Sequence, residues 1–141
     1  MLNSTVLSSK DITELINLKG KEKGIEVTHI EIDKGIVFSG KIFTKVKNSS
    51  FSGIVYIKSF YGNKIMLEAR NLNISKFGIL KGASTLILKT VVKILGDDYI
   101  SIKGNDIIIN LEKYTSDIKD VYIKDKLLYI IGTNLEIYLN A

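Results

Sequence analysis

FGILKGASTLILKTVVKIL, residues 77–95, is the one long helix-type segment in a chain whose other apolar runs are short and strand-like. On a helical wheel of about 100° per residue, its apolar side chains cover an arc of roughly 200°. A helix that lies against one sheet needs only about half of that arc. We therefore predict that this helix is central to the fold and is covered on more than one side: by a curling sheet, the N-terminal helix, another subunit or an apolar ligand.

Residues 25–74, which precede the helix, have the pattern of four long strands. The apolar positions change parity near residues 28–29 and again between Ala69 and Leu72, and such a change within a strand indicates a bulge or a bend. Turn sequences separate the strands at Asp33-Lys34-Gly35, Asn48-Ser49-Ser50 and Tyr61-Gly62-Asn63. Together these features predict a curved antiparallel meander.

A short amphipathic helix is predicted near the N-terminus. Asp11, with Glu14 three residues later, has the spacing of a capping box, and Gly20 ends the apolar pattern. Residues 1–9, before this helix, are polar and are predicted to be flexible. A helix of this length needs a surface to dock on, because short helices are marginal in water by themselves.

The C-terminal part is predicted to form two hairpins, around Gly104-Asn105 and at residues 124–126. The residues of the last strand that share parity are predicted to lie on its buried face: Leu127, Tyr129, Ile131, Leu135, Ile137 and Leu139. The expected fold class is thus α+β. A highly curved antiparallel sheet, made of the meander and the C-terminal hairpins, wraps around one long apolar helix, with a short N-terminal helix, in a single domain over residues 1–141.

The composition is that of a globular protein, with 45% hydrophobic and 25% charged residues in 141. Cysteine is absent and His29 is the only histidine. The sequence therefore has no residue for a disulfide or a thiolate metal site, and only one histidine for a zinc site. No apolar run reaches the roughly 18 residues of a membrane span, and no signal peptide is visible. As the sequence stands we predict a cytoplasmic protein, with peripheral membrane association as an alternative.

The net charge of +5 is unevenly distributed along the chain. Residues 34–93 contain ten lysines and one arginine against the single acid Glu68, which is 11 − 1 = +10, whereas the two ends carry nine bases and fourteen acids, which is −5. Such asymmetry is typical of a surface for an anionic partner: a phospholipid headgroup, a nucleic acid or an acidic protein. The alternative is that lysines simply occupy solvent-facing strand positions.

Of these three kinds of partner, a nucleic acid is the one that the sequence supports least. Lys41, Phe43, Lys45 and Lys47 share one strand face, which mixes cations with an aromatic ring as single-strand binders do. Arginine, the side chain that most often forms paired hydrogen bonds to phosphates and bases, is nearly absent.

Enzymatic activity is also not expected. The spacing G-x-x-x-x-G-K at residues 35–41 matches a phosphate-binding loop, but Ile42 stands where that loop needs Ser or Thr. Its internal residues form strands rather than loops. No catalytic group, metal site or cofactor is predicted.

The order of these elements resembles a known family. Three hairpins share an apolar-x-Ile segment, a polar turn and an apolar run: IEIDKGIVFSG, ISIKGNDIIINLE and VYIKDKLLYIIG. With the meander and the apolar helix they resemble the tubular lipid-binding (TULIP-like) proteins, in particular the small bacterial DUF2993 (YceB-like) proteins. The similar stretches are residues 25–47, 51–74, 77–95 and 121–139. The resemblance implies a highly curved sheet wrapped around a long helix, with an apolar groove for acyl chains.

We therefore predict a non-catalytic protein that binds a lipid or another apolar small molecule in a groove between sheet and helix. The alternative is a structural or assembly module that uses its spare apolar surface for contact with another protein or another copy of itself. The predicted ligand-binding residues are Ile79, Leu80, Ala83, Leu86, Ile87 and Val91. The predicted residues for an anionic headgroup or membrane surface are Lys41, Lys45, Lys81 and Lys89.

Overall fold

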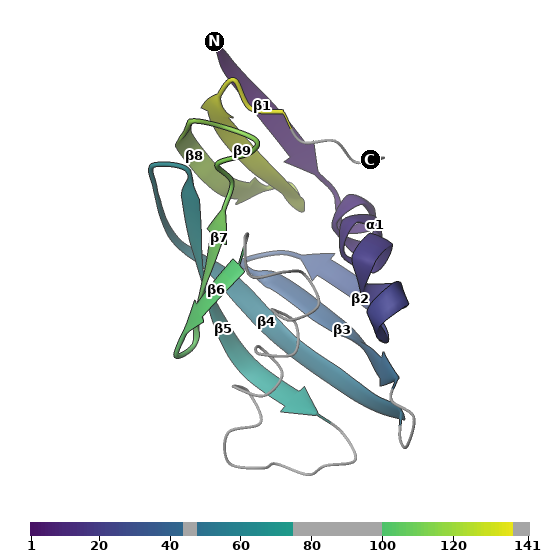
Figure 1. Cartoon of the computed structure of the whole chain (residues 1–141). Helices are drawn as coiled ribbons and strands as arrows, with labels where there is room; N and C mark the ends of the chain where they lie inside the picture. Colours follow the sequence, from purple (N-terminus) through teal and green to yellow (C-terminus); the bar gives the residue numbers. More distant parts are fainter. Residues whose placement is uncertain (44–47, 75–99, 137–141) are drawn as a thin grey trace.

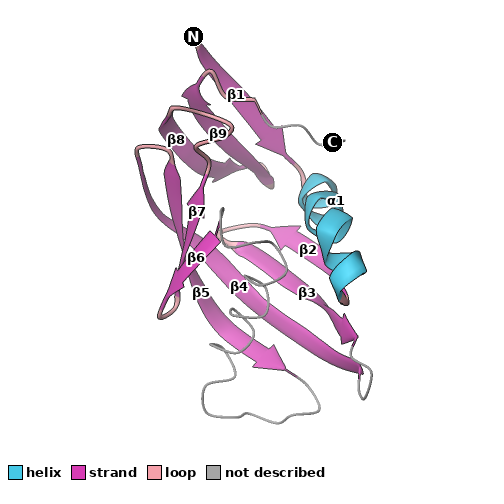
Figure 2. Cartoon of the chain, viewed as in Figure 1, coloured by secondary structure: helices cyan, strands magenta, loops and turns pink. Residues whose placement is uncertain are grey.

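The computed structural model describes residues 1–43, 48–74 and 100–136, which form two antiparallel sheets and one short α-helix (Figures 1 and 2). The large sheet has the strand order β2-β3-β4-β5-β7-β6, and the small sheet has the order β1-β9-β8. The elements are β1 (Leu2–Leu7), α1 (Ser9–Gly20), the 3-10 turn η1 (Lys21–Lys23), β2 (Ile25–Ile32), β3 (Ile36–Phe43), β4 (Asn48–Tyr61), β5 (Lys64–Ile74), β6 (Ile100–Lys103), β7 (Asp106–Asn110), β8 (Asp117–Lys124) and β9 (Leu127–Thr133).

The predicted fold class is wrong in its architecture, although the chain is rich in antiparallel sheet as expected. Instead of one sheet wrapped around a long apolar helix, the strands divide into two sheets. The only α-helix in the described part is α1, which has 12 residues. The predicted helix at residues 77–95 lies outside the described residues. In the described part the apolar side chains are buried by packing between the two sheets and α1, so strand faces supply the core that the prediction assigned to a helix.

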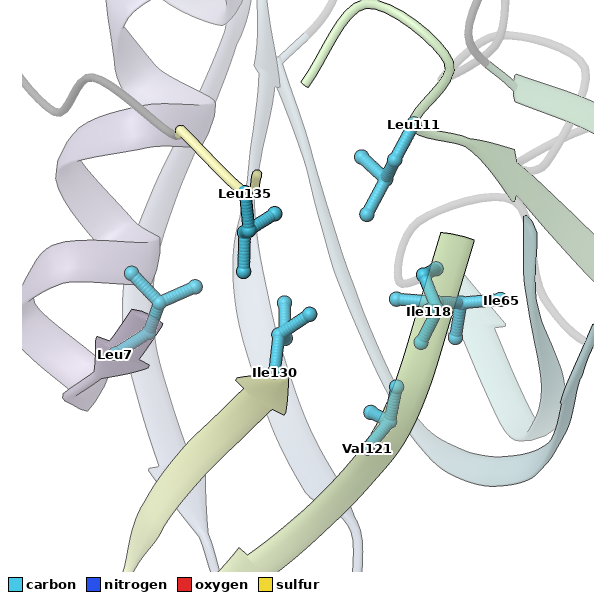
Figure 3. Packing of buried hydrophobic residues seen from close by; sticks show 7 residues of the cluster. All are labelled: Leu7, Ile65, Leu111, Ile118, Val121, Ile130 and Leu135. Atoms are coloured by element: carbon cyan, nitrogen blue, oxygen red, sulfur yellow. The ribbon is translucent and has the colours of Figure 1, made fainter. Parts of the chain in front are cut away.

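Two clusters of buried side chains make up this core. The first joins the sheets, because β1, β8 and β9 contribute Leu7, Val121 and Ile130 while β5 contributes Ile65 (Figure 3). The second lies on the α1 side of the large sheet and includes Ile32, the most fully buried large side chain. Ile12 of α1 packs against both clusters. The helix therefore covers the place where the two sheets meet (Figure 1).

The predicted hairpins of the large sheet are confirmed in part. Ile32 pairs with Ile36 across Asp33-Lys34-Gly35, and Gly62 and Gly104 take positive φ angles of 56° and 64° in their turns. Gly35 is required for a different reason, because a larger residue would not fit: a Cβ there would lie 2.8 Å from the Val55 carbonyl oxygen. The predicted turn at residues 48–50 is wrong, since these residues begin strand β4.

Both predicted irregularities of the meander are confirmed. The register of β2 against β3 shifts between Val27 and His29, which places a bulge where the apolar parity changes. In β5 the second shift accompanies Asn71, which has a φ of 54°. The extra residue at each site turns the following side chains to the other face, so the apolar set stays on the core side.

The N-terminal region differs from the prediction in two respects. The helix cap is Ser8 rather than Asp11: the Ser8 hydroxyl accepts from the Asp11 N–H at 3.1 Å, and the Asp11 carboxylate accepts from the Ser8 N–H at 2.9 Å. Asp11 is thus the second member of the capping box, and the helix begins earlier than predicted. Residues 2–7, which were expected to be flexible, form strand β1, which pairs with residues 128–133 of β9.

Candidate functional site

The predicted ligand-binding residues Ile79, Leu80, Ala83, Leu86, Ile87 and Val91 all lie outside the described residues, as do Lys45, Lys81 and Lys89 of the headgroup set. Lys41 is the only one of these residues that is described. It is exposed on β3, directly opposite Glu26 of β2. The structure therefore places one predicted cation beside an acid, and the rest of the predicted set stays a prediction.

Among the described residues, the lysine-rich middle of the chain forms one ion pair with an acid from another segment and one within its own strand β5. Lys58 Nζ lies 3.1 Å from an Asp106 carboxylate oxygen, which joins β4 to β7. Arg70 Nε lies 3.1 Å from Glu68 Oε1, and the guanidinium carbon of Arg70 lies 5.1 Å from the centre of the Tyr56 ring. The hydrogen bond to Glu68, together with its negative charge, raises the pKa of the exposed Arg70 guanidinium. Asp106 comes from the acidic part of the chain, so folding partly neutralises the charge asymmetry seen in the sequence.

Metal and membrane sites are not found in the described ranges 1–43, 48–74 and 100–136. There, no group of three or more His, Asp or Glu side chains lies close enough to hold a metal ion. His29 lies 3.9 Å from Glu31 on the exposed side of β2. None of the described helices has the length and apolar character to cross a membrane.

The strongest candidate site is the outer face of the small sheet, the side turned away from the core. Cross-strand pairing places Val6, Tyr129 and Tyr122 in one row across β1, β9 and β8. Cross-strand partners in an antiparallel sheet share a face. The apolar side chains of this outer face are Leu2, Val6, Tyr122, Leu127, Tyr129 and Ile131.

Two of these six side chains are exposed and the other four are half-buried. Leu2 is 60% exposed and Val6 is 42% exposed, whereas Leu7, on the opposite face of the same strand, is 5% exposed. The rings of Tyr122 and Tyr129 stack with centroids 4.9 Å apart and planes 7° from parallel. The stack holds two aromatic faces in one fixed arrangement on the surface, and both rings keep a part of their area in solvent.

Charged residues surround the apolar patch on the β8 side. Asp120 lies opposite Ile131, and Lys124 lies opposite Leu127. Lys119, in the bulge of β8, forms a 2.7 Å ion pair with Asp117. A tyrosine-rich apolar centre with a charged rim is the composition typical of a surface that contacts another protein.

The sequence predicted the wrong face of β9 as buried, although Leu135 of the same predicted set, after the end of β9, is buried as expected. Ile137 and Leu139 of that set lie outside the described residues. Ile130 and Leu128 point to the core, and Tyr129 and Ile131, which were expected inside, lie on the outer face. Residues 127–131 are LLYII, apolar at both parities, so alternation cannot distinguish the two faces. A continuous apolar run in a strand of an antiparallel sheet is nevertheless a signal that both faces have apolar neighbours.

Comparison with protein family models, with curated proteins and with solved structures finds no match to this chain. The resemblance to the tubular lipid-binding proteins therefore stays a prediction.

Proposed function

We propose that this protein is a non-catalytic assembly module that docks a partner protein on the outer face of its small sheet. The observation that carries the proposal is the row Val6, Tyr129 and Tyr122, an apolar and aromatic row at the surface on a rigid three-stranded support. Stacked aromatic rings lose little conformational freedom on binding, and tyrosine is among the residues most enriched in energetically important interface positions.

The charged rim supports a protein partner over a purely apolar one. Asp120 and Lys124 provide both signs of charge within two strand positions of the tyrosines. A partner with complementary charges would be oriented by this rim and held by the apolar centre. An acyl chain would use the apolar centre only.

A photo-reactive phenylalanine analogue at position 129 tests this proposal in cells that express the full chain. We expect one discrete adduct, identified by peptide mass spectrometry as a single protein, and no such adduct from the analogue at Phe43. Phe43 is a matched control because it is 44% exposed but belongs to the large sheet. With the purified partner, Ile131→Lys should weaken binding at least about tenfold, because it buries a charge in the apolar centre. Identical adducts at both positions, or none at position 129, would contradict the proposal.

Binding of a lipid or another apolar small molecule is the second candidate. The observation that favours it is a group of half-buried isoleucines, Ile100, Ile102 and Ile107, on paired strands at the β6–β7 end of the large sheet. Native mass spectrometry of the protein purified without detergent tests it. A retained lipid mass that decreases with Ile102→Asn but not with Ser101→Asn would favour this candidate, and the absence of any adduct would count against it.

A further inference from the structure

In the described part of the chain, the edge strand β1 lacks the features that hinder the other edge strands from pairing with a further strand. Its sequence, LNSTVL, contains no charge and no proline, and it pairs with β9 along its length without a register shift. A flat, uncharged edge is a template for pairing with another strand. Figure 1 shows β1 at the margin of the small sheet, beyond β9.

The other three edges are each protected. The β2 edge has a bulge and binds the side chain of Asn17 through the backbone of Val27. The β8 edge has a bulge and the charged residues Lys119 and Asp120. Strand β6 has only four residues and ends in Lys103. Among the strands that the structure describes, β1 is thus the edge best suited to pair with another strand, because each of the other three has a feature that hinders such pairing.

The outward backbone groups of β1 belong to Leu2, Ser4 and Val6. The Met1 carbonyl accepts from the Asn134 N–H at 2.8 Å, so odd-numbered residues direct their polar groups toward β9. The Thr133 carbonyl, opposite Leu2, accepts from Thr115 on the other side of β9, which agrees with that alternation. The N–H and C=O groups of the even-numbered residues therefore point away from the sheet.

These three positions are self-complementary about a two-fold axis. If two β1 strands run antiparallel with Ser4 opposite Ser4, then Leu2 of each copy lies opposite Val6 of the other. Every outward N–H and C=O of the three residues then has a partner, as in an ordinary hydrogen-bonded antiparallel ladder. The apolar pairs fall on the outer face, and no charge is brought near a like charge.

We infer that β1 pairs with β1 of a second copy of this chain. The two small sheets join into one antiparallel sheet across a two-fold axis at Ser4, an isologous contact that closes after two copies. Leu2 and Val6 belong both to this edge and to the outer face of the proposed function, but pairing of the edge is tested at Ser4 and docking on the face at Tyr129 and Ile131, so failure of one is distinguishable from failure of the other.

Sedimentation equilibrium of the full chain over about a hundredfold range of concentration measures the association. We expect the wild-type protein to reach twice the mass of one chain. Ser4→Lys and Ser4→Glu should each remain at one chain mass, because like charges then lie opposite each other at the axis. An equimolar mixture of the two variants should recover the double mass, because Lys then faces Glu. Ser101→Lys, at an exposed position of the edge strand β6, is the matched control and should behave as wild type.

Two further readouts identify the strand edge itself. Ser4→Pro removes an outward N–H without removing a hydrogen bond to β9, and it should abolish the double mass. Hydrogen exchange of the Ser4 and Val6 amides should slow as concentration rises, whereas the Thr5 amide, already directed at β9, should not change. A wild-type protein of one chain mass at every concentration overturns the inference. Variants at Ser4 that keep the double mass overturn it equally.

Discussion

The side-chain amide of Asn17 on α1 makes two hydrogen bonds to one residue of β2: it donates to the Val27 carbonyl at 2.9 Å and accepts from the Val27 N–H at 2.7 Å. Val27 is 5% exposed and stands at the edge of the large sheet, immediately before the bulge. A neighbouring strand would normally satisfy these groups. A single helix side chain takes its place and ties α1 to the sheet.

Asn17→Leu is therefore expected to destabilise the protein by about 2–4 kcal/mol, because a buried donor and a buried acceptor both lose their partner. The measurement is the free energy of unfolding in urea, monitored by circular dichroism. Asn73→Ala is the control, because this exposed amide donates to the carbonyl of the nearby Asn71, and it should change stability by less than about 0.5 kcal/mol. Equal effects of the two substitutions would contradict the role assigned to Asn17.

Gly40→Ala should be more damaging than Gly104→Ala, for different physical reasons. A Cβ at Gly40 would meet the Glu26 carbonyl oxygen and lie 2.6 Å from Cζ of Phe51, a buried ring. We expect a loss of about 3 kcal/mol or more from this crowding. A Cβ at Gly104 would meet open space, but the residue has a φ of 64°. Alanine there should therefore cost only the backbone strain of the left-handed conformation, roughly 1 kcal/mol. Thermal unfolding midpoints in the reverse order would show that the β2–β3–β4 packing is looser than described.

Thr115 links the beginning of β8 to the end of β9. It is 3% exposed, and its hydroxyl lies 2.7 Å from the Thr133 carbonyl oxygen and 3.0 Å from the Asp117 carbonyl oxygen. Thr115→Val keeps the shape but removes the donor, and should reduce the free energy of unfolding by about 1–3 kcal/mol. Thr115→Ser keeps the hydroxyl and should lose less, so a serine variant as unstable as the valine variant would indicate that the methyl group, not the hydrogen bond, matters.

Ser8 provides a test of the helix start. Ser8→Ala removes the hydroxyl that accepts from the Asp11 N–H, and should cost about 1 kcal/mol. Ser8→Asp keeps an acceptor near the helix N-terminus and should be close to neutral. Ser9→Ala, one residue later, supplies no cap and should change the unfolding free energy by less than about 0.5 kcal/mol. A larger effect at Ser9 than at Ser8 would place the cap elsewhere.

Local signals predicted the parts of the large sheet that depend on neighbouring residues. The turns at Asp33-Lys34-Gly35 and at Gly62 and Gly104 follow from turn chemistry. The bulge at Val27/His29 follows from a change of apolar parity, which a regular strand cannot accommodate. The cap at Ser8 was missed, although the same local rule applies, because the pair Asp11 and Glu14 has the same spacing as Ser8 and Asp11.

The candidate site was not accessible to the same reasoning. Tyr129 and Ile130 are equally apolar neighbours in one strand, and only the position of β9 between β1 and β8, with the core on one side, decides which of them is buried. Strand β1 was missed because LNSTVL is short and polar, and its partner β9 is more than a hundred residues away in the sequence. A contact at that separation leaves no periodic trace in a single segment.

The sequence by itself determined an antiparallel, strand-rich chain, most of its turns and two of the three register shifts of the meander, because each of these depends on residues within a few positions of one another. The tertiary structure decided that the strands divide into two sheets, that Asp106 neutralises Lys58, and that β1 is an edge strand of the small sheet. Those outcomes depend on which distant segments meet. That choice is made by the total apolar surface buried, a property of the whole chain that no local window contains.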